Sequence, residues 1–191
     1  MMLRWPASEQ QHSYCKHTTP IMAWTTVIIT VSDRSAAGER ADLSGPEAAA
    51  LLDEELFDIQ RIDIIPDEME KVIRALEGCV RENIALVLTT GGTGFAPRDI
   101  TPEATLTVID RRADGLTAAM RTASLQKTPF AALSRAVCGI ARRTLIVNLP
   151  GSPKAVTECL SAIVPVLPHG LKLLRDMKVG DQEHAWGEEI R

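Results

Sequence analysis

A glycine-rich turn in the middle of the sequence has residue types that suit ligand binding. Gly91, Gly92, Thr93 and Gly94 come directly after the apolar run IALVLTT at residues 84–90. Glycines have no Cβ, so backbone N–H groups can approach an anion closely, and the threonine adds a hydroxyl donor. The turn lacks the Lys-Ser/Thr ending of a P-loop and the spacing of a dinucleotide fingerprint. Taken alone, the pattern indicates either an anion site or a simple chain reversal.

Four aspartates follow three β-rich runs at the points where parallel strands would end. Asp33 and Asp42 follow the first run, Asp67 the second and Asp99 the third. Each aspartate alone could be a helix cap or a turn residue. Like charges gathered at one sheet edge destabilise the fold unless a cation or substrate offsets them. Together they therefore indicate a site for Mg²⁺, shared with substrate phosphates and suited to phosphoryl or nucleotidyl transfer.

A second candidate anion site lies late in the chain. Residues 148–154, NLPGSPK, lead from an apolar run into an expected helix, and Pro150 and Gly151 form the turn. The N–H groups and dipole at a helix N-terminus favour negative charge, and Lys154 adds a positive one. The same segment also suits an ordinary turn and helix start. Upstream, Ser134 and the arginine that follows it could bind a phosphate or an oxygen-rich ring.

Other common site chemistries have no matching pattern. No Ser-His-Asp or Cys-His set is evident, because the four histidines lie outside these loops. The four cysteines form no C-x-x-C pair and have no histidine at zinc-ligand spacing, which argues against a structural zinc site. Cys159 is expected to be a small core residue, because it shares a helical face with Val156, Leu160 and Ile163.

Composition narrows the partners and the compartment. With 45% hydrophobic and 24% charged residues, the chain is predicted to be globular, and its net charge of −4 without a basic stripe argues against nucleic acid. No apolar run reaches the roughly 20 residues that span a bilayer. Residues 1–21 lack the apolar core of a secretory signal, so a flexible extension and a cytoplasmic location are expected. Residues 178–191 are expected to be a polar tail.

The elements that must position these residues alternate between strand and helix. Strands are expected at 25–32, 59–65, 84–90, 137–140 and 144–149, and helices after Ser44, Asp67, Thr101 and Ser152 and over 115–125. Alternation of this kind implies parallel pairing. The prediction is one α/β domain over residues 22–177, a three-layer α/β/α sandwich with a mostly parallel central sheet. In such sheets ligands bind beyond the carboxyl ends of the strands.

Taken together, these motifs resemble those of one known family. TVSDRSAAGERADLSGP, IIPDE, LTTGGTGFAPRDITPEAT, TPFAALSRA and LIVNLPGSPKAV stand in this order between residues 25 and 174. The sequence resembles the MoaB/Mog family of molybdenum-cofactor biosynthesis proteins. The resemblance implies a molybdopterin-binding α/β fold, a homotrimer, and transfer of AMP from ATP to the molybdopterin phosphate with Mg²⁺ and release of pyrophosphate. It also implies a separate partner protein that inserts molybdate afterwards.

The resemblance also implies roles for particular residues. Asp67 and Asp99 match acidic positions implicated in catalysis and metal handling, and Asp42 matches a third acidic position of the site. Thr93 lies in the segment associated with nucleotide and pterin, and Ser134 matches a position associated with the pterin. The remaining expected binding residues are Gly91, Gly92, Gly94, Pro150, Gly151 and Lys154, with Arg98 and Lys154 as expected anion clamps. The sequence departs from the family pattern around residues 39–40 and has no counterpart for its first twenty-odd residues.

Two other functions stay open at this point. A protein that binds or carries molybdopterin without chemistry would keep the same pocket. A nucleotide hydrolase on the same fold would share the glycine-rich turn, but it has no use for a second substrate site at PGSP and LSR. Retention of the aspartates favours the enzyme, because binding of an anionic pterin alone would be stronger without them.

Overall fold

The computed structural model describes residues 23–177. Met22 and the predicted N-terminal extension and C-terminal tail lie outside the described residues. A six-stranded sheet runs through the middle of the domain in the order β2-β1-β3-β6-β5-β4. The strands are β1 (Trp24–Val31), β2 (Phe57–Ile65), β3 (Leu86–Thr90), β4 (Arg111–Arg112), β5 (Cys138–Ala141) and β6 (Thr144–Leu149).

Pairing in the sheet is parallel on one side and antiparallel on the other. β1 pairs in parallel with β2 and β3, and β3 pairs in parallel with β6. β5 and β4 complete the sheet as antiparallel strands, because β5 returns to β6 through a tight turn. Arg142 in that turn has a φ of 52°, a left-handed conformation. The sheet is therefore mostly parallel, as predicted, with an antiparallel edge that includes the unpredicted β4.

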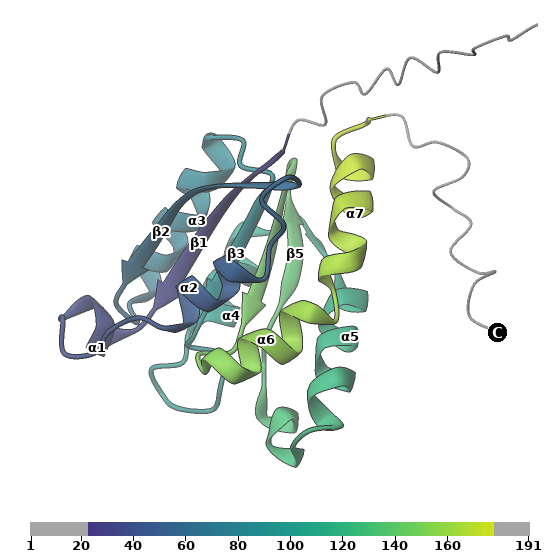
Figure 1. Cartoon of the computed structure of the whole chain (residues 1–191). Coiled ribbons are helices and arrows are strands. Elements are labelled where there is room, and N and C mark those ends of the chain that lie inside the picture. The colour runs from purple at the N-terminus through teal and green to yellow at the C-terminus, as the bar shows by residue number, and fades with distance from the viewer. Residues whose placement is uncertain (1–22, 178–191) are drawn as a thin grey trace, which may run out of the picture.

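Helices cover both faces of the sheet (Figure 1). They are α1 (Asp33–Ala36), α2 (Ser44–Ala50), α3 (Met69–Arg81), α4 (Thr101–Val108), α5 (Asp114–Leu125), α6 (Pro153–Ser161) and α7 (Leu167–Leu174), with 3₁₀ turns η1 (Pro129–Leu133) and η2 (Val164–Val166). α3 and α4 pack against one face, and α2, α5, α6 and α7 pack against the other. The three-layer sandwich is thus confirmed. None of the helices in the described part is long and apolar enough to cross a membrane.

Alternation along β1 shows how one strand serves both cores. Ile28 belongs to the core beneath α2, α5, α6 and α7, and Val27 and Ile29 belong to the core beneath α3 and α4. All three side chains are fully buried. Successive side chains of a strand point to opposite faces, so a strand covered on both sides is apolar throughout. The predicted core position of Cys159 is confirmed in the cluster beneath α6.

Three expected helix caps are wrong, and each error concerns the candidate site. Ser44 is the first residue of α2 rather than its cap, and the Asp42 carboxylate accepts the N–H groups of Ser44 and Gly45 at 3.0 and 3.2 Å. Asp67 does not cap α3, which begins after Glu68 without a side-chain cap; its carboxylate instead accepts the Asp33 N–H at the start of α1. Thr101 is the first residue of α4 rather than its cap. Ser152 is confirmed as the cap of α6, accepting from the N–H two residues beyond Pro153 at 3.3 Å.

Candidate functional site

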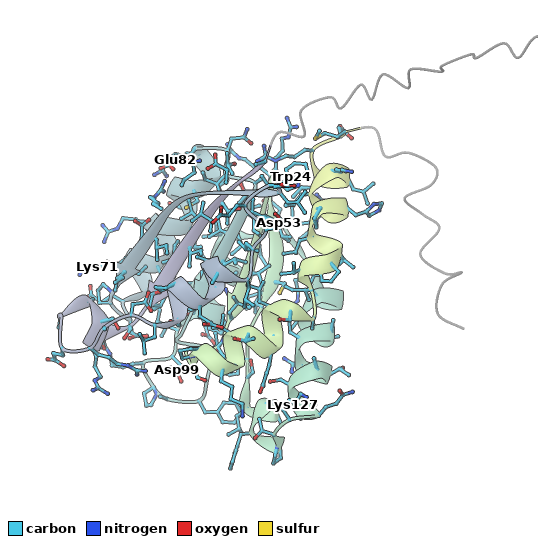
Figure 2. The ribbon with its side chains drawn as sticks, in the orientation of Figure 1. Trp24, Asp53, Lys71, Glu82, Asp99 and Lys127 are labelled. Atoms are coloured by element: carbon cyan, nitrogen blue, oxygen red, sulfur yellow. The ribbon has the colours of Figure 1, made fainter. Side chains whose placement is uncertain are left out.

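The candidate residues gather where the parallel strands end. The loops after β1, β2, β3 and β6 all leave the sheet at the same edge, because the four strands run in one direction. Asp99, in the loop after β3, lies at this end of the molecule, whereas Trp24, Asp53 and Glu82 lie at the other end (Figure 2). The predicted site residues therefore share the end of the sheet at which the parallel strands finish.

A large cavity lies beside the glycine-rich turn. Its volume is about 430 Å³, and residues from the turn, α5, η1 and α6 line it. Of the predicted residues it is lined by Gly92, Thr93, Gly94, Asp99, Ser134, Pro150 and Gly151. The cavity mixes apolar walls with hydroxyl groups, which suits a heterocycle that carries polar substituents. We call it the main cavity.

A second pocket adjoins the main cavity across the glycines. Its volume is about 310 Å³, and it is lined by the ends of β1 and β3 and by the loop before α2. Asp42, Gly91 and Gly151 line it, and Gly151 and Ser152 belong to both spaces. A Cβ added to Gly151 would stand only 3.2 Å from Gly91 Cα, so the wall between the two spaces is bare backbone. We call this second space the polar pocket.

The backbone of the turn requires glycine for two reasons. Gly91 and Gly92 have φ angles of 89° and 61°, in the left-handed region that disfavours side chains. A Cβ at Gly91 would collide with the carbonyl oxygen of Val31, and one at Gly92 would collide with Thr101 Oγ1. The N–H groups of Gly92, Thr93 and Gly94 donate no hydrogen bond to any residue of the described range. Three successive N–H groups without protein partners, on residues that line the main cavity, are thus available to an anion.

Hydrogen bonds of Thr101 and of Asp99 close the loop that follows the turn. Thr101 N donates to the Gly92 carbonyl at 3.1 Å and its hydroxyl donates to the Gly91 carbonyl at 2.9 Å. Asp99 folds back on Ala96: the Ala96 N–H donates to Asp99 Oδ2 at 2.8 Å, and the Asp99 N–H donates to the Ala96 carbonyl at 2.8 Å. The carboxylate of Asp99 is consequently held on the wall of the main cavity rather than free in solvent.

Asp33 and Asp67 bind each other's backbones across the ends of β1 and β2. The Asp33 N–H donates to Asp67 Oδ2 at 2.7 Å, and the Asp67 N–H donates to Asp33 Oδ1 at 3.0 Å. Arg98 makes a bidentate contact with Asp33: its Nε donates to Oδ2 at 2.5 Å and its Nη2 donates to Oδ1 at 2.8 Å. Those Arg98 hydrogen bonds hold the pKa of Asp33 below its ordinary value of 3.8. Arg98, an expected anion clamp, is thus already paired with a carboxylate.

The electrostatic state of Asp67 differs from that of Asp33. Burial raises the pKa of the Asp67 carboxyl, and the neighbouring charges of Asp33 and Asp99 add to that rise. The hydrogen bond from the Asp33 N–H and the charge of Arg98 act in the opposite direction without cancelling it. A carboxylate with an unmet charge is the kind that gains from a bound cation.

Asp42 stands apart from the other three aspartates. Its carboxylate accepts four hydrogen bonds: Thr30 Oγ1 at 2.7 Å, Ser44 N at 3.0 Å, Ser44 Oγ at 2.9 Å and Gly45 N at 3.2 Å. Burial acts to raise its pKa, but these donors outweigh burial and leave the pKa below its ordinary value. The four aspartates therefore divide into a group of three near the turn and a single one that fastens α2 to β1.

The carboxylates at the turn offer a metal ion only part of its ligand set. No group of three or more His, Cys, Asp or Glu side chains among residues 23–177 is arranged to hold an ion. Asp67 and Asp99 nevertheless flank the turn, since a Cβ at Gly92 would stand 3.2 Å from Asp67 Oδ1 and one at Gly94 would stand 2.8 Å from Asp99 Oδ2. Two carboxylates fit Mg²⁺ only where substrate phosphates and water supply its other oxygen ligands.

Three expected residues line neither space, and one helix supplies residues that the sequence analysis missed. Asp67 lies close to Gly92 without lining either space, Arg98 is exposed and paired with Asp33, and Lys154 is exposed on the first turn of α6. α5 contributes Thr117, Met120, Arg121 and Ser124 to the main cavity, and Arg121 is its one cationic lining residue in the described part. Their spacing is i, i+3, i+4, i+7, one helical face. The signal in the sequence that could have identified them was the presence of polar residues on a helix face expected to be apolar.

The architecture and the site together define a class: an α/β protein whose ligand crevice lies at the carboxyl edge of a parallel sheet, beside a glycine turn and carboxylates. Comparison with known sequences specifies the family. The family described as "Probable molybdopterin binding domain" matches residues 27–169. The chain belongs to this family, and the MoaB/Mog resemblance is confirmed.

Relatives and solved structures agree with that assignment. The chain is 41% identical to a protein of Helicobacter pylori named molybdopterin adenylyltransferase, over 77% of this chain and 85% of that one. It is 44% identical to the Drosophila melanogaster molybdenum cofactor synthesis protein cinnamon over 78% of this chain, but it spans only 25% of that relative's length. The crystal structure of the molybdopterin biosynthesis enzyme MoaB from Thermus thermophilus superposes with a TM-score of 0.76 at 46% identity, covering 80% of this chain and 97% of that one.

Proposed function

We propose that the protein is a molybdopterin adenylyltransferase, acting in molybdenum cofactor biosynthesis, that transfers AMP from ATP to the phosphate of molybdopterin. The observation that carries the proposal is the meeting of the main cavity and the polar pocket at one bare backbone wall, with Asp99 beside it. Two adjoining spaces accommodate two substrates whose phosphates must meet. Relatives named for this activity at 41% identity over 77% of the chain support the assignment.

The proposed reaction joins two phosphates without a covalent enzyme intermediate. An oxygen of the pterin phosphate attacks the α-phosphorus of ATP, a new P–O bond forms, and the bond to the β-phosphate breaks, so that pyrophosphate leaves with its electron pair. The pterin is assigned to the side of the main cavity that carries Ser134 and Arg121. The free N–H groups of Gly92, Thr93 and Gly94 then face the reacting phosphates, where fixed donors stabilise developing charge.

Asp67 and Asp99 are the proposed holders of Mg²⁺, on the two sides of the turn. When bound, the ion would neutralise charge that develops on the phosphate oxygens. Both carboxylates are held in place, because Asp67 accepts the Asp33 N–H and Asp99 accepts the Ala96 N–H. Asp42, Gly91, Pro150, Gly151 and Lys154 are retained as proposed binding residues, with Asp42 acting by holding the wall of the polar pocket.

The test is pyrophosphate release from ATP and molybdopterin in the presence of Mg²⁺. Asp67→Asn and Asp99→Asn are expected to lower the rate by about 10²-fold or more, because each removes a charge placed at the reacting phosphates. Asp53→Asn is the matched control, since Asp53 lies at the opposite end of the molecule and only accepts local N–H groups (Figure 2). Equal rates in wild type and both site variants would refute the proposed roles.

A carrier of molybdopterin is the second candidate. The observation in its favour is that Arg121, on α5, and Ser134, directly after η1, line the main cavity, whereas Asp67 does not. Calorimetric titration with ATP and with pterin separately distinguishes the two: pterin binding without ATP binding at millimolar Mg²⁺ supports the carrier. The proposed homotrimer is tested by light scattering, against a chain mass of 20.8 kDa. A partner that inserts molybdate into the product completes the proposal.

A further inference from the structure

Arg135 makes an unusual set of contacts with the loop that bears Asp99. Its Nε donates to the Gly94 carbonyl at 2.7 Å, and its Nη2 donates to the Asp99 carbonyl at 2.6 Å. Nη1 pairs with the Glu103 carboxylate on α4. Its own backbone N–H donates to the Thr93 carbonyl at 2.9 Å. All three guanidinium nitrogens thus have partners within the protein.

This arrangement leaves the guanidinium unsuited to the phosphate contact that the sequence indicated. A phosphate would have to displace at least one carbonyl or carboxylate partner. The side chain is only 33% exposed, and its partners are the two ends of one loop. Gly94 and Asp99 are five positions apart in the sequence, and the Nε and Nη2 donors of one planar guanidinium fix the separation of their carbonyls. The two Arg135 hydrogen bonds hold the Asp99 backbone, and they therefore also constrain the position of the Asp99 carboxylate.

We propose that Arg135 is a positioning residue for the adenylyl transfer: it closes the Gly94–Asp99 loop so that the Asp99 carboxylate faces the substrate phosphates. The inference rests on the proposed function for its catalytic consequence but not for the loop geometry. Lysine can replace it only in part, because an ammonium is a point donor on a flexible stem, whereas the guanidinium presents planar donors in fixed directions. Arg135 therefore acts through Asp99 and touches no substrate itself.

The expected kinetic effect follows from the distance by which the loop is released. A misplacement of a reacting group by 1 Å can cost about 10²-fold in rate. Arg135→Ala is expected to lower kcat by about 10²-fold, and Arg135→Lys by about tenfold, with a smaller change in KM for the pterin. Glu103→Gln removes the ion pair and leaves both carbonyl contacts, so its kcat should stay within about threefold of wild type.

The decisive readout is hydrogen exchange of the substrate-free protein, measured by mass spectrometry at residue resolution. The Asp99 amide donates to the Ala96 carbonyl within the loop at 2.8 Å, and the Thr101 amide, just after the loop, donates to the Gly92 carbonyl of the turn at 3.1 Å. In Arg135→Ala their exchange should speed up by about tenfold or more, because two charge-assisted hydrogen bonds that hold the loop are lost. The Phe57 amide, which donates to Asp53 at the far end, should keep its rate. Arg112→Ala is the matched arginine control, as Arg112 makes an exposed pair with Asp114 and lines neither the main cavity nor the polar pocket.

Each outcome decides between the possibilities. Faster exchange at Asp99 and Thr101 with a fall in kcat supports the positioning role. Unchanged exchange overturns it, and faster exchange with wild-type kcat overturns it as well. Faster exchange across the whole domain, including Phe57, would show a general loss of stability and would also overturn it. Absence of any adenylyl transfer by the wild-type protein refutes the proposed function alone, because the exchange result does not depend on turnover.

Discussion

Replacement of Gly91 by alanine tests how the glycine turn is built. Gly91 has a φ of 89°, and a Cβ there would collide with the Val31 carbonyl oxygen at the end of β1. Two penalties therefore act at one position: an unfavourable backbone conformation and a steric clash with rigid backbone. Neither can be relieved by rotating a side chain, because the opposing atom belongs to a strand that is paired on both sides.

The magnitude follows from adding these two effects. A non-glycine residue in a left-handed conformation costs about 1–2 kcal/mol. Forcing an extra carbon into a packed site costs about 1–3 kcal/mol more. Gly91→Ala is therefore expected to lower the free energy of unfolding by about 2–5 kcal/mol. Anion binding at the turn should weaken as well, since the strand end and the turn must move apart.

Two other glycines separate the contributions. Gly38 has a φ of 74° but open space around its Cβ position, so Gly38→Ala should show the backbone penalty alone, about 1–2 kcal/mol. Gly115 lies in α5 with open space and no positive φ, so Gly115→Ala should be neutral or stabilising by up to about 1 kcal/mol. The assay is urea unfolding of all three variants at one protein concentration, with equal slopes required for comparison. A loss at Gly91 within about 0.5 kcal/mol of that at Gly38 would refute the steric argument.

Three further expectations can be checked on the same protein. The pKa of Asp67 is raised above 3.8 in the fold, so its ionised form opposes folding. Asp67→Asn should accordingly exceed wild type in stability at pH 7 without Mg²⁺, and that gain should shrink as the pH falls through the folded pKa; urea midpoints across pH measure it, and a gain that grows on acidification contradicts it. Asn148 is fully buried and accepts the Val137 N–H at 3.1 Å. Asn148→Ala should destabilise by about 2–4 kcal/mol in urea unfolding, and a loss below about 1 kcal/mol would count against it. Arg98→Ala should raise the pKa of Asp33, whose depression comes first from the Arg98 hydrogen bond, as followed by NMR titration of its carboxyl carbon; an unchanged pKa is the contrary result.

Local patterns in the sequence were sufficient for most of the fold. Continuous apolar runs predict strands covered on both faces, and β1, β3 and β6 lie where such runs stand. The Ser-Pro pair at 152–153 predicts the start of α6 because both residues act on the adjacent backbone. Caps were less predictable: Ser44 and Thr101 have suitable side chains, but both hydroxyls bond to residues outside their own helices. Their partners, Thr90 and Gly91, lie on or beside β3.

The candidate site shows the same contrast between local sequence patterns and contacts with distant segments. The glycine turn and the aspartates were recognisable because residue type and position after a strand are local properties. The sequence alone determined which side chains could bind phosphate or metal and that they would share one edge of the sheet. Only the tertiary structure decided that Asp33 and Asp67 pair across β1 and β2 while Asp42 fastens α2. It also decided that α5 lines the main cavity and that Arg135 holds a loop. These outcomes depend on which distant segments pack together, and that choice is made by burial of the whole core rather than by any single stretch of chain.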